Sequence, residues 1–121
     1  VNQLVSIKDN KYYILGPFSA WIDFSEFYTA QFYRRKKEMN VMAKVITDHK
    51  ERARVKRLKT INSEFRFLKS FDTVAEFIVW QNKVATISFE KNSIKGIVIE
   101  DTEIARLYEI IFQNLWSIAL R

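Results

Sequence analysis

The sequence predicts an α/β domain, in which a mixed β-sheet is flanked by helices. In the first half of the chain, β-rich runs alternate with helical patterns, which favours parallel strands joined by crossovers. In the second half, the β-rich runs 74–80 and 83–89 are separated only by Gln81-Asn82. Such a break predicts a tight hairpin, because Asn tolerates the left-handed backbone of these turns. The hairpin makes the expected sheet mixed.

Composition sets the outer limits. The chain has 121 residues, of which 48% are hydrophobic, so residues 1–121 form one domain that can bury roughly two-thirds of its unfolded surface. No apolar run approaches the ~18 residues of a membrane span. The absence of cysteine excludes disulfides and cysteine-ligated zinc, and it fits a cytoplasmic protein. Because the chain begins at Val1 without an initiator Met, we expect partner domains outside it.

The first elements are a strand over 11–16, ended by Gly16-Pro17, and a helix that opens at Asp23 and runs to Met39. Phe18 and Trp21 lie in the irregular connection between them. Arg35 falls on the apolar face of this helix. Either its stem lies along that face with the guanidinium in water, or its head meets a carboxylate or a bound anion.

Next come a central strand over 41–47, a second helix that opens at Asp48 and ends at Lys59, and a half-buried strand over 64–68. Lys44 is the polar exception in the first strand, and Arg66 alternates with phenylalanines in the second. Between Arg34 and Lys69 there are 13 basic residues against 4 acidic ones. This excess indicates either a nucleic-acid or anionic ligand, or simply solvated helix faces.

A further short strand over 96–100 leads into the C-terminal helix, which Asp101 caps and Glu103 stabilises at its N-terminus. Its expected core face and the residues that widen it make a stripe of about half the cylinder: Ile104, Tyr108, Ile111, Leu115 and Ile118, then Leu107, Phe112, Trp116 and Ala119. One sheet does not need so much apolar surface. We therefore expect a homodimer with Phe112, Trp116 and Ala119 at its interface, unless the 18–22 connection covers them.

The sequence offers little for catalysis. It has one histidine, His49, and no cluster of metal-ligating residues, so no metal and no cofactor are expected. Two glycines cannot build a phosphate-cradling loop. His49 lies beside Asp48 and Lys50, where a solvated position in the first helical turn is the expected role.

Three stretches resemble the C-terminal effector domain of TrmB-type transcriptional regulators: FYRRKKEMNVMAKVIT, EFRFLKSFDTVAEFIVWQNKVATISFE and IKGIVIEDTEIARLYEIIFQNLW. In that family this region is similar to one half of a phospholipase-D-like fold. The resemblance implies an effector-sensing and dimerisation domain that follows a winged-helix DNA-binding domain absent from this chain. It also implies a shift in dimer geometry as the means of regulation.

The phospholipase-D likeness also bears on catalysis. Active members carry the motif H-x-K-x-x-x-x-D just before a hairpin turn. Aligned on Gln81-Asn82, these positions are occupied by Val74, Glu76 and Gln81. Val74 cannot attack phosphorus, and Glu76 would repel the phosphate that a lysine would hold. The resemblance therefore implies a protein that is not an enzyme.

We expect this chain to be a non-catalytic, TrmB-like domain that binds a small-molecule or anionic effector through Arg35, Lys44 and Arg66. It would form a homodimer, reach DNA through a domain outside the chain, and make no membrane contact. The alternative is a basic domain that binds nucleic acid directly through residues 50–59. A degenerate phosphodiesterase is a third, weaker hypothesis.

Overall fold

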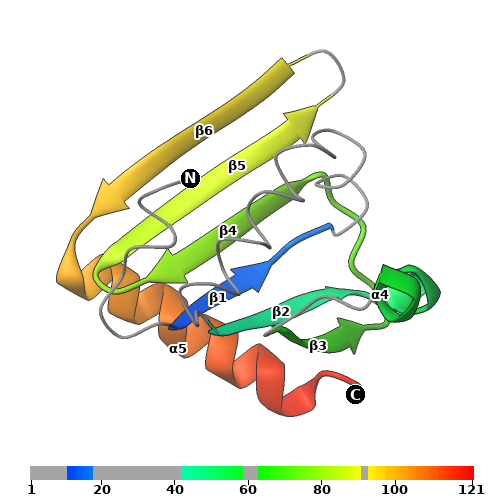
Figure 1. Ribbon diagram of the computed structural model, residues 1–121. Coiled ribbons are helices and arrows are strands. Elements are labelled where there is room, and N and C mark those ends of the chain that lie inside the picture. The colour runs from blue at the N-terminus through cyan, green and yellow to red at the C-terminus, as the bar shows by residue number, and fades with distance from the viewer. Residues whose placement is uncertain (1–10, 18–41, 59–62, 91–92) are drawn as a thin grey trace.

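A computed structural model describes residues 11–17, 42–58, 63–90 and 93–121 of the chain. Its elements in chain order are β1 (Lys11–Leu15), β2 (Met42–Asp48), a 3₁₀ turn (His49–Glu51), α4 (Arg52–Leu58), β3 (Ser63–Leu68), β4 (Ala75–Trp80), β5 (Lys83–Glu90), β6 (Ser93–Glu100) and α5 (Thr102–Ile118) (Figure 1). The helix expected over 23–39, with Arg35, and the 18–22 connection lie outside the described residues.

The strands form a single sheet in the order β3-β2-β1-β4-β5-β6. Strands β1, β2 and β3 are parallel, with Ile14 opposite Val45 and Val45 opposite Phe65. The second half is antiparallel throughout, from β1 against β4 to β5 against β6. The predicted mixed sheet is therefore confirmed, and the strand expected over 41–47 is central, between β1 and β3. Strand β6 begins at Ser93, earlier than the expected Gly96.

The hairpin between β4 and β5 has the predicted two-residue turn, with Trp80 paired to Lys83 across it. The positive φ falls on Gln81, at 52°, and not on Asn82 as the sequence suggested. The carbonyl of Asn82 accepts a 2.9 Å hydrogen bond from the backbone N–H of Asp101. This contact holds the turn against the start of α5.

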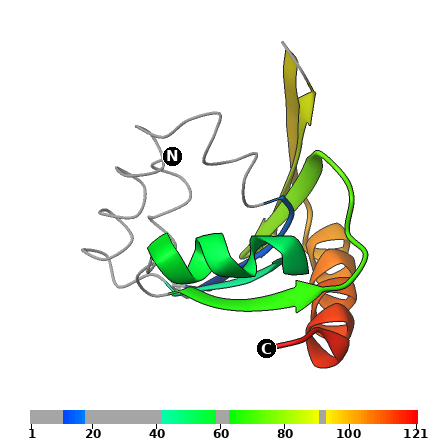
Figure 2. The ribbon, with the colours of Figure 1, turned by 90° about the vertical axis from the view of Figure 1, so that its right-hand side faces the viewer.

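Helices α4 and α5 lie on opposite faces of the sheet (Figure 2). Alternation along β3 explains the arrangement, since Arg66 faces α5 while its neighbour Phe67 faces Arg52 of α4. On the α5 side the core is built from Ile46, Phe112 and Trp116, with Val79, Val84 and Ala105 forming a second cluster. On the other face the core residues are Ile14, Ala43, Val45, Ile78, Trp80 and Ala85.

Helix α5 begins as predicted, because the Asp101 carboxylate accepts a 2.9 Å hydrogen bond from the N–H of Ile104. Its buried residues are Ala105, Phe112 and Trp116. The sequence-based core face was wrong for Ile104, Ile111 and Ile118, all of which are exposed. The physical reason is that the helix approaches Val79 and Val84 closely at Ala105, and only a small side chain fits there. The aromatic side chains then fill the wider space along the helix.

Candidate effector site and self-association surface

The α5 face of β2 and β3 brings together two of the predicted ligand-binding residues, Lys44 and Arg66. Arg66 is paired with Ile46, two residues beyond Lys44, so the two basic side chains are diagonal neighbours. Both lie over the indole of Trp116, with the Arg66 guanidinium carbon at 4.4 Å and the Lys44 Nζ at 5.2 Å from the ring centroid. Cation–π attraction accounts for this grouping.

Arg66 also serves as a cap for α5. Its Nη1 donates a 2.7 Å hydrogen bond to the carbonyl oxygen of Trp116, in the last turn of the helix. Such carbonyls lack helical partners and carry the negative end of the helix dipole, so a cation there is stabilising. Arg66 Nε is buried without a hydrogen-bond partner among the described residues. Arg66 therefore contacts α5 through both its hydrogen bond and its guanidinium face. Of the two cations, Lys44 is the better candidate for binding an anion.

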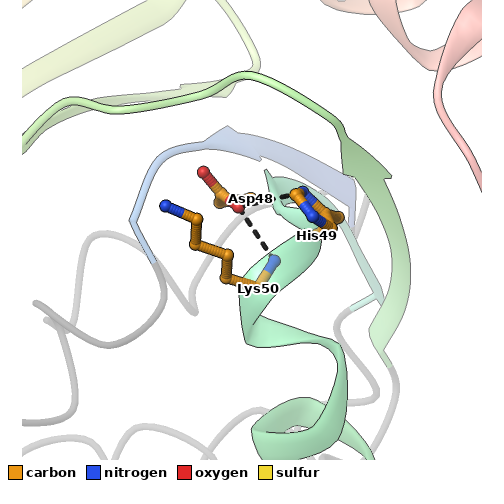
Figure 3. Close-up of polar contacts among 3 residues, drawn as sticks. All are labelled: Asp48, His49 and Lys50. Atoms are coloured by element: carbon orange, nitrogen blue, oxygen red, sulfur yellow. Dashed lines mark hydrogen bonds and ion pairs between the residues drawn. The ribbon is translucent and has the colours of Figure 1, made fainter.

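The basic residues of the 50–59 segment follow a small polar cluster at the end of β2. The Asp48 carboxylate accepts a 2.8 Å hydrogen bond from the backbone N–H of Lys50, and its Oδ1 lies 3.3 Å from Nδ1 of His49 (Figure 3). The predicted N-cap at Asp48 is therefore confirmed, although the turn that it opens is 3₁₀ and α4 starts only at Arg52. His49 is exposed, as expected for a first-turn residue.

The 3₁₀ turn and α4 together present a basic surface, formed by the exposed residues Lys50, Arg52, Lys56 and Arg57. Arg52 lies over the buried ring of Phe67, with its guanidinium carbon 4.8 Å from the centroid. The contact with Phe67 of β3 therefore fixes the orientation of Arg52, one of these four cations. Because α4 and α5 lie on opposite faces of the sheet, the basic surface is separate from the Lys44–Arg66 pair.

Glu76 is a buried carboxyl that sequence reasoning did not foresee. It lies on β4 next to Gly16, where a Cβ added to the glycine would lie only 2.1 Å from the Glu76 Cβ. Glu76 is 5% exposed, and its Oε1 has no hydrogen-bond donor among the described residues. Burial raises the pKa of this carboxyl to about 8. The Glu76 side chain is thus a largely neutral acid at pH 7.

The outer side of α5 carries a set of exposed aliphatic residues, which we call the α5 stripe: Ile104, Leu107, Ile110, Ile111 and Ile118. Leu107 is 54% exposed and Ile118 is 71% exposed. These positions are three, four or seven residues apart, so they share one side of the helix. Exposed apolar surface of this extent is typical of a site for another molecule.

The predicted interface residues Phe112 and Trp116 do not belong to this stripe. Phe112 has no exposed surface, and its ring packs 5.0 Å from that of Tyr13 and 5.8 Å from that of Trp116. Ala119 is the C-cap, whose N–H donates to the carbonyl of Leu115. Phe112 and Trp116 are occupied within one chain, so the prediction that they face a partner is corrected. The surplus apolar surface lies about a quarter turn or more around the helix.

Among the described residues there is no group of three or more His, Cys, Asp or Glu side chains that could hold a metal ion. No helix in the same part of the chain is long and apolar enough to cross a membrane.

This architecture, a mixed six-stranded sheet with helices on both faces, is an α/β fold that known structures share. It is similar to the structure of TrmBL2, described as an archaeal chromatin protein with a novel mode of DNA binding, with a TM-score of 0.66 and 15% sequence identity. The match covers 98% of this chain and 47% of the TrmBL2 chain, so this chain spans about half the length of that protein. No protein-family model and no curated protein sequence matches the chain.

Proposed function

We propose that this chain is a non-catalytic domain of a TrmB-like transcriptional regulator that senses an effector and self-associates. The fold similarity to TrmBL2 over nearly the whole chain supports a relation to such regulators. In this proposal DNA is bound by a domain outside the chain, and the present domain sets how two copies are held together. The observation that carries the proposal is the exposed α5 stripe.

The size of the stripe favours a stable pair of copies. The exposed parts of its five side chains amount to roughly two and a half whole aliphatic side chains. At about 1.5–3 kcal/mol for each side chain buried, two copies gain roughly 8–15 kcal/mol from these residues. Association costs about 4–15 kcal/mol in lost freedom, so further contacts are needed for tight binding. Micromolar affinity corresponds to about 8 kcal/mol of net binding free energy, so the remaining contacts between the two copies must supply several kcal/mol.

The effector part of the proposal rests on Lys44 beside Trp116. The Lys44 ammonium offers a positive charge on the α5 face of β2, which suits a small anionic ligand. The test is thermal denaturation in phosphate and in sulfate at constant ionic strength. We expect stabilisation of the native chain that is lost in Lys44→Ala, while Lys56→Ala on α4 serves as the matched surface control. An equal response from all three proteins would rule out this site.

Self-association is tested by two substitutions on the same helix. Leu107→Glu places a charge in the stripe, whereas Arg106→Glu changes charge on an exposed neighbour outside the stripe. Light scattering at tens of micromolar should give a dimer for the native chain and for Arg106→Glu, and a monomer for Leu107→Glu. Circular dichroism checks that both variants are folded. A native monomer, or equal effects of the two variants, would contradict the proposal.

The basic surface of α4 favours a second candidate function, direct nucleic-acid binding by residues 50–59. A surface made only of exposed cations predicts weak, sequence-independent binding whose affinity falls steeply with salt, because counterion release drives it. Fluorescence anisotropy with two unrelated DNA duplexes between about 50 and 200 mM salt measures this. Tight, sequence-selective binding by the 121-residue chain would favour the second function over the first.

A further inference from the structure

Among the described residues, nothing covers a hollow that lies beside α5 on the same face of the sheet. Side chains of β4, β5 and β6 line it, and its volume is about 320 Å³. The lining residues on this face are Ala75, Thr86, Ser88, Lys95 and Ile97. Ile97 is 62% exposed at the edge strand, so the hollow opens to solvent and its lining is mainly apolar.

The hollow and the α5 stripe form one continuous surface. Phe77 of β4 is paired with Thr86, and Thr86 is paired with Ile97, so these three residues make a row across the sheet. Helix α5 covers only the Phe77 end of this row, where the Tyr108 ring packs edge-on against the Phe77 ring with 5.1 Å between the ring centroids. Ile104 and Ile111 lie next to Tyr108 on the helix, at four- and three-residue spacing. The stripe therefore borders the hollow on the side of the helix that faces it, and Trp116 lies on the other side, over Lys44 and Arg66.

A helix beside an uncovered strip of sheet is a self-complementary shape, because one copy presents both the ridge and the place that receives it. Two-fold pairing buries the same patch on both copies and leaves no ridge unpaired. We propose that two copies of this chain pair about a two-fold axis, with the α5 stripe of each copy lying in the hollow over β4–β6 of the other. This inference rests on the proposed self-association and specifies its geometry.

Area and charge both favour a second copy as the occupant. A standard interface buries about 800 Å² on each partner, of which somewhat more than half is apolar. The stripe supplies on the order of 300 Å² of apolar surface, and the hollow with Ile97 supplies apolar surface of its own. Charges match as well, since Lys95 lines the hollow and Glu103 lies one turn before Leu107 at the border of the stripe.

The absence of cysteine from the chain allows a direct test by cross-linking. One preparation carries Thr86→Cys in the hollow and another carries Leu107→Cys in the stripe. Mixing the two under mild oxidation should give a disulfide-linked product of twice the chain mass, with a yield several-fold above that of Thr86→Cys mixed with Arg106→Cys. Equal yields from the two mixtures would overturn the arrangement.

A second measurement separates this geometry from self-association in general. Thr86→Arg fills the hollow without touching the stripe, and we expect it to weaken the dimer at least about ten-fold in sedimentation. Lys95→Glu should weaken it about three-fold, and Glu103→Lys in the same chain should restore the affinity, as for a charge pair at an interface rim. If the native chain is a dimer and neither hollow variant changes its affinity, the hollow is not the contact surface while self-association stands. A native monomer overturns both.

Discussion

Replacing Glu76 by glutamine should make the stability of the domain less sensitive to pH. The substitution keeps the shape of the side chain and removes its ionisation. In the native chain, the pKa of Glu76 is about 8 in the folded state, against an ordinary value of 4.5, because burial disfavours the charged carboxylate. Below pH 4.5 the carboxyl is protonated in both states, and it contributes no difference in stability.

Between pH 4.5 and pH 8 the unfolded chain has lost this proton and the folded chain still holds it. Stability therefore falls as pH rises through this window, and it levels off above the folded pKa. With these two pKa values, the cost between pH 5 and pH 8 is about 3 kcal/mol. Glu76→Gln should lose about 3 kcal/mol less than the native chain over the same interval.

Urea denaturation at pH 5 and at pH 8, followed by circular dichroism, gives the free energies of unfolding. Glu64→Gln is the matched control, because it makes the same chemical change at an exposed position on β3. If the native chain and Glu76→Gln changed in parallel between the two pH values, the burial of an ionisable Glu76 would be refuted. The same conclusion would follow if the native chain gained stability relative to the variant as pH rose.

Three further outcomes are expected. Arg66→Ala should lower the free energy of unfolding, measured in urea, by about 1–3 kcal/mol, because it leaves the Trp116 carbonyl without its hydrogen-bond donor. Lys44→Ala should lower it by less than about 1 kcal/mol. A larger loss in Lys44→Ala than in Arg66→Ala would contradict the capping role of Arg66. Asp101→Ala should cost about 1 kcal/mol through loss of the N-cap, and Asp101→Asn should recover most of it, which the same denaturation experiment measures. Incubation with a generic phosphodiester substrate should give no cleavage, and turnover that is abolished by substitution of Glu76 would contradict the proposed non-catalytic role.

Local sequence patterns were sufficient for most of the sheet. The hairpin at Gln81-Asn82 and the cap at Asp101 depend on residues close together in the chain, and the parallel half follows from the alternation of strands and helices. The structure confirms all three. The position of the positive φ at Gln81 was not predicted, because Asn is generally the more tolerant residue in the left-handed region and local propensity therefore favoured Asn82.

The orientation of α5 was beyond what periodicity could show. Two apolar sets run along this helix side by side, and hydrophobicity alone favours the one with Ile104 and Ile111 over the one that begins with Ala105. The decision depends on how closely the helix approaches Val79 and Val84, which is a property of the packed sheet. Because the predicted core face was wrong, the predicted dimer interface was wrong as well: it included Phe112 and Trp116, which are buried within one chain.

The candidate effector site shows the same limit. Lys44 and Arg66 stood out as basic residues in strands, but their meeting over Trp116 depends on the register between β2 and β3 and on where α5 ends. Glu76 gave no local signal of burial, because a glutamate in an alternating strand is expected to face water. The one clue in the sequence was Gly16, whose missing side chain leaves the space that Glu76 occupies.

The central claim is that the α5 stripe is a surface for a second copy of the chain, and residue-resolved NMR tests it without any substitution. Amide shifts of the ¹⁵N-labelled native chain would be followed while it is diluted from a few hundred micromolar to a few micromolar. We expect concentration-dependent shifts at Ile104, Leu107 and Ile111 and unchanged shifts along α4. Shifts that do not depend on concentration, or that change only along α4, would contradict the claim.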